Sequence, residues 1–412
     1  MVETAPKRPN FQPQFPLKVR FLNGIGTPLK PLIKLNEESL LSEAQRQTGL
    51  SDWGNESFRV PFQILLKSLN REANLHFVGR SALRQRLLRL LVNRLRIQDH
   101  LKRYPEVLDV PIKRPLFILG LPRTGTTFLH NLLAQDPTSR WLRLWEILYP
   151  CPPPHPTTEK TDPRIQETAK QVQKINTIAP QLSTVHHLDP QAPEEGNQLF
   201  EHGMVGFLFE AMATVPSYTK CLQEQELFTT YRYYRQQLQL LGWNYPDKHW
   251  ILKAPFHLLH LDALLTAFPD ACIVHTHRNP LQVLPSMCSL CAIVRGIYSD
   301  RVDLQEIGQQ WLNNLAKAIE KAMKVRQTAN SEQFYYLDYQ DLVSDPVGTV
   351  RRIYDYFDYS LSPEMENNMK AWIANHPQHK YGAHHYTLEQ FGLDAEIVNA
   401  RFSNYRERFN IA

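Results

Sequence analysis

A short apolar segment, a glycine-containing loop and a helical pattern constrain the fold of this chain more than any other stretch. Residues 116–119 read Leu-Phe-Ile-Leu, a run typical of a strand buried on both faces of a parallel sheet. Gly120 and Gly125 bracket the loop that follows, and glycine adopts backbone conformations that other residues avoid. Apolar residues then recur at helical spacing, at Phe128, Leu129, Leu132 and Leu133. We therefore predict a strand, a tight loop and a helix.

This loop predicts an anion-binding site. Its backbone N–H groups converge at the N-terminus of a helix, where the helix dipole places partial positive charge. The spacing nearly matches G-x-x-x-x-G-K-[ST], with Thr127 in the last position but Thr126 where the lysine should stand. Arg123 is the one cation of the loop. The loop indicates a phosphate-like ligand and disfavours ATP hydrolysis, and a glycine turn without a ligand is the alternative.

The length and composition favour a globular protein with one large domain and an accessory one. A chain of 412 residues can bury a large core. We expect an N-terminal arm and helical subdomain over residues 1–110, and an α/β domain over 111–412 with a helical insertion at about 150–245. The net charge of +5 is spread thinly and forms no arginine-rich run. Small anionic ligands therefore fit better than nucleic acid.

The sequence shows no membrane or export signal. No apolar stretch approaches the ~20 residues of a membrane span, and the basic start lacks the apolar region of a secretory signal. Five cysteines at low density suit a reducing compartment, so we expect a cytoplasmic protein. Cys288 and Cys291 form a lone C-x-x-C without a second pair at zinc-site spacing. We interpret them as buried helical residues and predict no metal site.

The N-terminal third is expected to be an arm followed by helices. Residues 1–35 are rich in proline, lysine and asparagine, which predicts an extended or partly disordered arm. Residues 37–104 carry leucines at helical spacing, with a break at 49–54. We interpret the arginines of this region as a solvated helix face, with a surface for an acidic partner as the alternative. They are Arg80, Arg84, Arg86, Arg89, Arg94 and Arg96.

The middle of the chain mixes loops and helices. Residues 141–149 are either a second strand or the edge of a helix. Residues 151–156 contain four prolines and must form a loop. Residues 162–182 form an amphipathic pattern, and residues 198–245 are helical and rich in aromatic side chains. Core packing is the favoured explanation for most of these aromatics, and an apolar acceptor pocket is the alternative.

Three cations follow three predicted strands. Arg123 stands in the first loop, and Lys253 and Arg278 lie at the ends of two further apolar runs. In a parallel α/β sheet, the carboxyl ends of the strands carry the ligand chemistry, so we expect the three cations to converge. The further strands are expected at residues 250–257, 271–280 and 334–339.

Together, three motifs resemble a known enzyme family. They are Pro122-Arg-Thr-Gly-Thr-Thr-Phe128, Leu252-Lys-Ala-Pro255, and Arg278 with Ser286 eight residues on. They resemble the sulfotransferases that use 3′-phosphoadenosine 5′-phosphosulfate (PAPS), in particular the bacterial branch related to the tyrosylprotein sulfotransferases. The resemblance is strongest over about residues 110–360. It implies a P-loop-like three-layer α/β/α fold with a central parallel sheet.

The resemblance also implies roles for individual residues. The 5′-phosphosulfate loop would consist of Arg123, Thr124, Gly125, Thr126 and Thr127. Arg278 and Ser286 match the pair that holds the 3′-phosphate, and Lys253 matches the lysine near the bridging oxygen. Tyr339 lies near a position that approaches the nucleotide, and Lys380 begins a Lys-Tyr-Gly segment similar to a late motif of the family.

The base that accepts the proton of the acceptor hydroxyl has several candidates. His186 occupies the position where related bacterial enzymes place a histidine before Pro-Glu-Glu, and Glu194 or Glu195 could orient it or replace it. The two glutamates could instead begin a helix after Pro193. Glu146 and His257 are rivals by their distances from Arg123 and Lys253. We favour His186.

The resemblance implies a sulfotransferase that moves a sulfuryl group from PAPS to a hydroxyl acceptor by in-line displacement, leaving adenosine 3′,5′-bisphosphate (PAP), without a metal. The aromatic-rich middle suggests a small-molecule, lipid-like or glycan-linked alcohol as the acceptor. One alternative is a P-loop-like kinase or NTPase, which would need ATP, magnesium and a carboxylate at a strand end. Another is a nucleotide-binding protein without catalysis.

Overall fold

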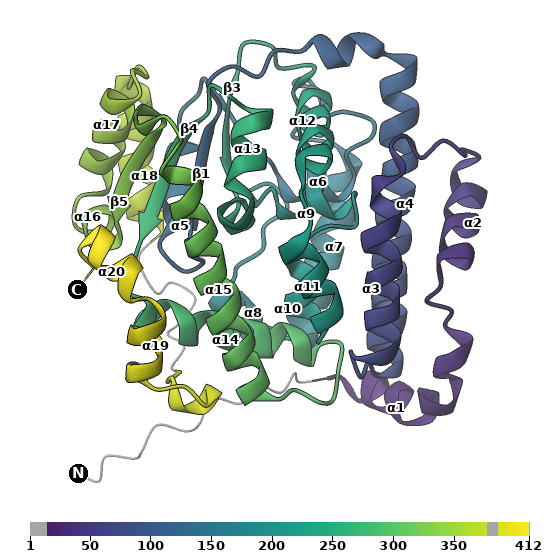
Figure 1. Ribbon diagram of the computed structural model, residues 1–412. Coiled ribbons are helices and arrows are strands. Elements are labelled where there is room, and N and C mark those ends of the chain that lie inside the picture. The colour runs from purple at the N-terminus through teal and green to yellow at the C-terminus, as the bar shows by residue number, and fades with distance from the viewer. Residues whose placement is uncertain (1–14, 377–385, 412) are drawn as a thin grey trace.

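A five-stranded parallel sheet forms the centre of the molecule. The computed structural model describes residues 15–376 and 386–411. The strands pair in the order β2-β3-β1-β4-β5, and each ladder is parallel. This sheet, with helices on both sides (Figure 1), confirms the predicted P-loop-like α/β architecture. The strands are β1 (Leu116–Gly120), β2 (Ser139–Arg140), β3 (His249–Lys253), β4 (Cys272–His277) and β5 (Phe334–Asp338).

The strand β1 shows why a continuous apolar run was needed here. All five of its residues are buried, and successive side chains point to opposite faces of the sheet. Phe117 and Leu119 join one core cluster, whereas Leu116 and Ile118 join the other. The second cluster is closed by α5 (Thr126–Leu133), α17 (Pro346–Tyr356) and α18 (Pro363–Asn375). The first is closed by helices that include α12 (Phe228–Gly242), α13 (Leu261–Ala267) and α15 (Leu304–Arg326).

Four α-helices precede the sheet in the described part of the chain. Those of residues 37–104 confirm the prediction, and the chain turns at Gly49, whose φ is +70°. The predicted extended arm is wrong for residues 17–32, which form a helix and a 3₁₀ turn. Contacts of Asn23 with Val78 and of Gly26 with Phe77 hold this helix in place. The helices are α1 (Leu17–Gly26), α2 (Glu37–Thr48), α3 (Arg59–Arg71) and α4 (Phe77–Arg103). Leucines of α2, α3 and α4 share one continuous core cluster with the sheet, and a domain boundary near residue 110 stays a prediction.

The region between β2 and β3 is helical. Residues 144–148 form α6 (Leu144–Leu148), so the strand expected at 141–149 is wrong and the helix edge is right. The predicted helix at 162–182 is two helices, because Pro180 begins a new one. These helices are α7 (Pro163–Ile178), α8 (Pro180–Val185), α9 (Asn197–Glu201), α10 (Leu208–Met212) and α11 (Pro216–Glu224). After β4 come α14 (Pro280–Gly296), α16 (Tyr339–Ser344), α19 (Ala395–Arg401) and α20 (Ser403–Phe409).

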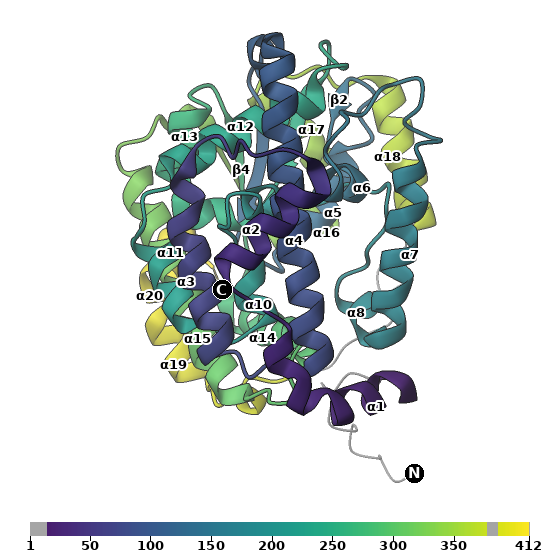
Figure 2. The ribbon, with the colours of Figure 1, turned by 90° about the vertical axis from the view of Figure 1, so that its right-hand side faces the viewer.

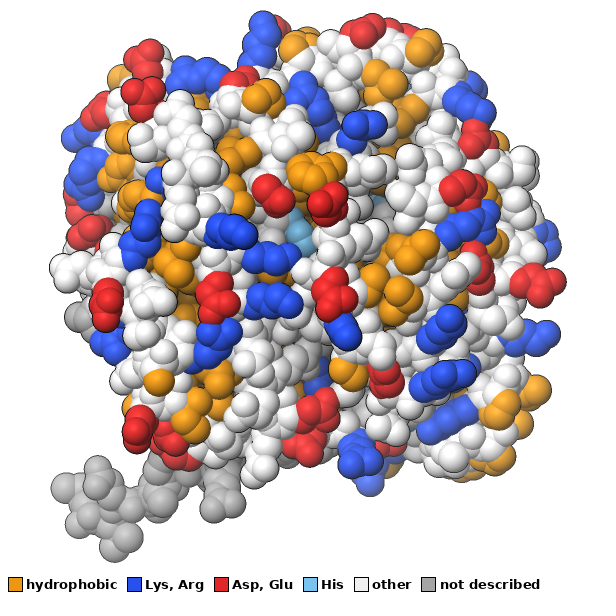
Figure 3. All heavy atoms as spheres, viewed as in Figure 1, with side chains coloured by type: hydrophobic (Ala, Val, Ile, Leu, Met, Phe, Trp, Pro, Cys, Tyr) orange, Lys and Arg blue, Asp and Glu red, His pale blue; other side chains and the backbone are white. Residues whose placement is uncertain are grey.

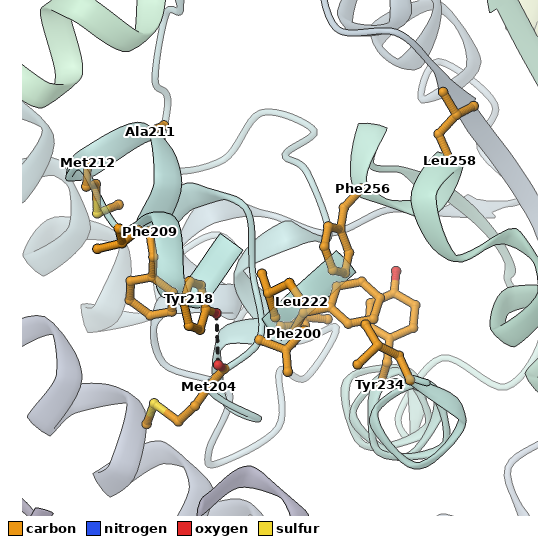
Figure 4. Packing of buried hydrophobic residues seen from close by; sticks show 14 of the residues in the cluster. Phe200, Met204, Phe209, Ala211, Met212, Tyr218, Leu222, Tyr234, Phe256 and Leu258 are labelled. Carbon is orange, nitrogen blue, oxygen red and sulfur yellow. Dashed lines mark hydrogen bonds between the residues drawn. The ribbon is translucent and has the colours of Figure 1, made fainter. Parts of the chain in front are cut away.

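Most aromatic side chains of residues 198–245 pack in the core, as predicted. Phe200 stacks on Tyr234 with ring centroids 4.4 Å apart, and the Tyr218 hydroxyl donates to the Met204 carbonyl at 2.9 Å (Figure 4). Cys288 and Cys291 are buried free thiols on α14, which confirms their structural interpretation. Across the described ranges, the longest helices remain too polar or too short to cross a bilayer.

Gly120 ends β1 in a conformation that would strain an alanine at this position. Its φ is +151°, and a Cβ there would lie 2.4 Å from Thr276 Oγ1 and 2.5 Å from the Thr276 carbonyl oxygen. We expect Gly120→Ala to lower the free energy of unfolding by about 3 kcal/mol in urea titrations. Gly24→Ala is the matched control, because nothing lies within 4 Å of a Cβ at Gly24. Equal stabilities of the two variants would show that this close approach is not required.

Candidate active site

The loop between β1 and α5 is shaped to hold an anion. Gly125 is the N-cap of α5 with φ +84°, and Arg123 also has a positive φ of +68°. Thr124 is fully buried, and its Oγ1 lies 2.6 Å from Thr276 Oγ1 and donates to the Leu121 carbonyl at 2.7 Å. Its side chain therefore fixes the loop from inside. Thr127, by contrast, is exposed in the first turn of α5, where unpaired N–H groups and the helix dipole favour an anion.

Lys253 connects this loop to the segment that carries the candidate base. It is the last residue of β3 and is buried, and its Nζ donates to Thr127 Oγ1 at 3.1 Å and to Glu195 Oε1 at 2.6 Å. Burial raises the pKa of the Glu195 carboxyl, but the Lys253 ammonium outweighs it and holds that pKa below its usual range. The pair is thus an ion pair at the carboxyl end of β3.

Lys253 and its two partners form one cationic cluster. A second cationic cluster consists of Arg123, Ser286 and Arg278. Arg123 Nε donates to Ser286 Oγ at 3.0 Å, and Arg278 Nη1 donates to the Arg123 carbonyl at 2.9 Å. The Arg278 guanidinium lies 4.1 Å from the centre of the Tyr339 ring. Burial lowers the pKa of Arg123; the nearby Tyr386 opposes this effect and the positive charge of Arg278 adds to it. A bound anion would relieve the repulsion between the two guanidinium groups.

The predicted convergence of the three cations is therefore present. Arg123 and Arg278 follow β1 and β4, and Lys253 is the last residue of β3; these strands are neighbours in one parallel sheet. One detail differs from the expected separation into two phosphate sites. Arg123 was expected at the 5′-phosphosulfate and Ser286 at the 3′-phosphate, but their side chains touch. Arg123 thus links the two expected anion positions.

His186 and Glu194 lie together, as the sequence suggested. His186 Nε2 is 3.9 Å from Glu194 Oε1, and the same oxygen accepts the Glu195 N–H at 2.7 Å. The helix start expected after Pro193 is wrong, because α9 begins at Asn197 and the two glutamates precede it. The Glu195 carboxylate therefore contacts Lys253, and the Glu194 carboxylate lies beside His186, instead of at the N-terminus of a helix.

The two rival bases lie elsewhere. Glu146 is fully buried between Arg140 and Arg143, with N–O distances of 2.9 and 3.0 Å. His257 lies in the aromatic core, where its Nδ1 is 2.9 Å from the Tyr231 hydroxyl and burial lowers its pKa to about 3. The described structure places both outside the walls of the cavity at the loop. Lys380 lies outside the described residues.

A cavity of about 640 Å³ opens beside these groups. Its polar end is lined by Arg123, Gly125, Thr126 and Thr127 of the loop, by His186, Glu194 and Glu195, and by Arg278, Ser286 and Tyr339. Lys253 is covered by Thr127 and Glu195 and lies behind this wall. The rest of the wall is mostly apolar and comes from α6, α7, α8, α10 and α14. Its members include Leu144, Leu148, Val172, Ile175, Leu182, Met212, Met287, Leu290 and Val294.

Comparison with known proteins assigns the family. A model of the sulfotransferase family matches residues 115–363, a span that holds both cationic clusters and the His186–Glu194 pair. The chain belongs to the sulfotransferase family. The crystal structure of sulfotransferase STF1 from Mycobacterium tuberculosis H37Rv is 35% identical with a TM-score of 0.81, over 90% of this chain and 98% of that one.

Two further relatives of this sulfotransferase are mycobacterial. The crystal structure of sulfotransferase STF9 from Mycobacterium avium is 29% identical with a TM-score of 0.85, over 92% of this chain and 98% of that one. The omega-hydroxy-beta-dihydromenaquinone-9 sulfotransferase Stf3 of Mycobacterium tuberculosis (strain CDC 1551 / Oshkosh) is 26% identical over 298 residues. That match covers 67% of this chain and 71% of Stf3.

The interpretation of the α4 arginines as a solvated face is wrong for three of them in this sulfotransferase. Arg94 is buried and donates to the backbone carbonyls of Trp53 and His202. Arg86 pairs with the buried Glu201, and Arg89 donates to Gln171 at 3.1 Å. Burial lowers the pKa of Arg89 to about 10, and the charge of Arg86 adds to this effect.

Sequence reasoning therefore missed a cationic part of the cavity wall, because Arg86 and Arg89 both line it. A signal was present. Buried leucines surround these arginines on α4 at positions 83, 87, 90, 91 and 95, so no side of the helix is wholly polar. Within the described ranges, no cluster of three histidine, cysteine or acidic residues could hold a metal ion.

Proposed function

We propose that this sulfotransferase moves a sulfuryl group from PAPS to the hydroxyl of an apolar alcohol and releases PAP. One observation carries the proposal: Arg123, Arg278 and the His186–Glu194 pair line the polar end of one cavity, and Lys253 lies directly behind that wall. A donor with two anionic groups needs such a double site.

The donor would bind along the carboxyl edge of the sheet. The N–H groups at the start of α5 and the Thr127 hydroxyl would hold the 5′-phosphosulfate, and Arg278 with Ser286 would hold the 3′-phosphate. Arg123, which touches Ser286, would contribute to both. The Arg278 guanidinium lies over the Tyr339 ring, and this contact would fix the orientation of the arginine.

The chemical step would use His186 at the acceptor and Lys253 at the leaving group. His186 would accept the proton of the acceptor hydroxyl while the hydroxyl oxygen forms its bond to sulfur. The bond between sulfur and the bridging oxygen breaks, and its electron pair stays on the phosphate of PAP. Lys253 would stabilise that charge, and Glu194 would orient His186. Glu195 would keep the buried Lys253 neutralised before the donor binds.

The acceptor is proposed to be a long apolar alcohol, because aliphatic side chains from five helices line the cavity beyond the polar end. Stf3, a relative, is named for an omega-hydroxylated dihydromenaquinone, which is a lipid-like alcohol. We infer a cytoplasmic location, which the five free thiols suit.

Chain length should control acceptor efficiency. For primary alkanols from hexanol to dodecanol, we expect kcat/KM to rise about fourfold per methylene, since each buried methylene contributes about 0.8 kcal/mol. The measurement is the initial rate of PAP release at fixed PAPS for each alkanol. Rates that do not change with chain length would show that the apolar wall does not bind the alkyl chain of the acceptor.

Turnover tests the proposed reaction itself. Incubation with PAPS and the alkanol panel should give alkyl sulfate and PAP in equal amounts, measured by mass spectrometry, and EDTA should leave the yield unchanged. Phosphorylation of the alkanols or hydrolysis of ATP in the presence of magnesium would favour the kinase or NTPase alternative instead. Donor binding without any product across the panel would favour a non-catalytic nucleotide-binding protein.

A further inference from the structure

The first helix exposes an apolar face that the fold does not use. Leu17, Phe21 and Ile25 recur every fourth residue of α1 and are 81%, 65% and 52% exposed. Leu29 and Leu32 of the following 3₁₀ turn are 46% and 74% exposed. Five of the thirteen large hydrophobic side chains that are exposed among the described residues thus lie in this short segment. Such a concentration marks an interaction surface.

The same segment is cationic without any compensating acid. Lys18, Arg20 and Lys30 lie within it and Lys34 follows it, and residues 4–36 contain no aspartate or glutamate. On the face seen in Figure 3, the corner where Figure 1 places α1 carries apolar and basic side chains. Elsewhere on that face, acidic side chains are interspersed among the basic ones. The surface therefore complements an anionic partner.

The helix is held firmly on the body of the protein. Asn23 Oδ1 accepts the Val78 N–H at 3.0 Å, and Gly26 is buried so close to Phe77 that a Cβ would lie 2.4 Å from that ring. Packing thus uses the side of α1 that faces the start of α4 (Figure 2). The row from Leu17 to Ile25 points away from these contacts, so its exposure is a feature of the folded protein.

This surface lies next to the cavity. The start of α4 that holds α1 also touches the end of α14, because His76 N–H donates to the Tyr298 carbonyl at 3.1 Å. Gly79 approaches the same carbonyl so closely that a Cβ would lie 2.1 Å from its oxygen. Tyr298 and Ile297 line the cavity. The exposed helix is therefore two contacts away from the cavity wall.

We propose that residues 17–34 dock the protein on an anionic membrane surface. The apolar row would enter the boundary between headgroups and acyl chains, and the four basic side chains would contact phosphate groups, which is the arrangement of interfacial amphipathic helices. A protein partner fits less well, since lysine is depleted in protein interfaces. Delivery of a lipid-like acceptor to the neighbouring cavity would follow, and this last clause rests on the proposed function; docking itself does not.

Vesicle sedimentation of the full chain tests this docking. We expect binding to phosphatidylcholine vesicles that contain phosphatidylglycerol to be at least about tenfold tighter than binding to pure phosphatidylcholine, and to weaken as salt increases. Phe21→Ser with Ile25→Ser should reduce binding at least about tenfold. Val60→Ser with Ile397→Ser is the matched control, because both side chains are exposed elsewhere and should leave binding unchanged.

A second variant separates charge from apolar contact. Lys18→Gln, Arg20→Gln and Lys30→Gln together should remove the preference for anionic vesicles, whereas Lys67→Gln with Arg71→Gln should keep it. Absence of wild-type binding to either vesicle overturns the proposal, as does unchanged binding of the serine variant. Loss of a wild-type dimer in that variant, without vesicle binding, would assign the surface to a second copy and also overturn it. Titration with PAP tests the donor site separately. If PAP does not bind, the proposed function is wrong, but the vesicle experiment still tests membrane docking.

Discussion

Replacing Arg278 with alanine is expected to weaken PAP binding about 100-fold in calorimetric titrations. Loss of a charged donor to a phosphate removes about 3 kcal/mol of binding free energy. The guanidinium lies against Tyr339 and donates to the Arg123 carbonyl, so it is already in place at the end of β4. Arg278→Lys should recover part of the loss, because lysine keeps the charge but lacks the planar pair of donors.

The control for this variant is Arg326→Ala. Arg326 also lies over an aromatic ring, with its guanidinium 3.5 Å from the centre of Phe334, but it does not line the cavity. Its loss should leave PAP binding unchanged. If Arg326→Ala and Arg278→Ala weakened binding equally, the effect would come from general charge, and the assignment of Arg278 to the 3′-phosphate would be wrong.

His186→Ala should separate binding from chemistry. Removal of a general base lowers kcat by about 1000-fold, whereas the cations that hold the donor remain. We therefore expect the PAP dissociation constant to stay within about twofold. The measurements are calorimetry with PAP and steady-state rates with the most efficient alkanol. Glu194→Gln should lower kcat about tenfold, because its carboxylate lies 3.9 Å from the imidazole and is proposed to orient it.

The neighbouring His187 provides the matched control. It is exposed and does not line the cavity, so His187→Ala should keep the wild-type rate. A His186→Ala enzyme with wild-type kcat would exclude His186 as the base. Glu195 would then be the next candidate, and Glu195→Gln would test it, since that carboxylate also lines the cavity.

The cationic clusters could be predicted from the sequence because strand patterns and strand ends are local signals. The apolar run at 116–119 required burial on both faces, and parallel pairing then placed Arg123, Lys253 and Arg278 at one edge. What the sequence could not show was the partner of each cation. The Lys253–Glu195 and Arg123–Ser286 contacts join residues 58 and 163 positions apart.

The structure of the N-terminal region, by contrast, could not be predicted from the sequence. Prolines at positions 28 and 31 suggested an arm, yet they sit in a 3₁₀ turn after a helix that begins at Leu17. The arginines of α4 suggested a solvated face, but tertiary packing turned Arg86 and Arg89 toward the cavity. Composition did not predict the structure of these segments, because contacts with residues far away in the sequence decided it.

Calorimetric titration of the wild-type protein with PAP and, separately, with ATP and magnesium gives the most direct test of the proposed donor. A double cationic site without the P-loop lysine should bind PAP at least about 100-fold more tightly than ATP, a difference of about 2.7 kcal/mol. Tight binding of ATP with magnesium and no binding of PAP would contradict the proposed donor.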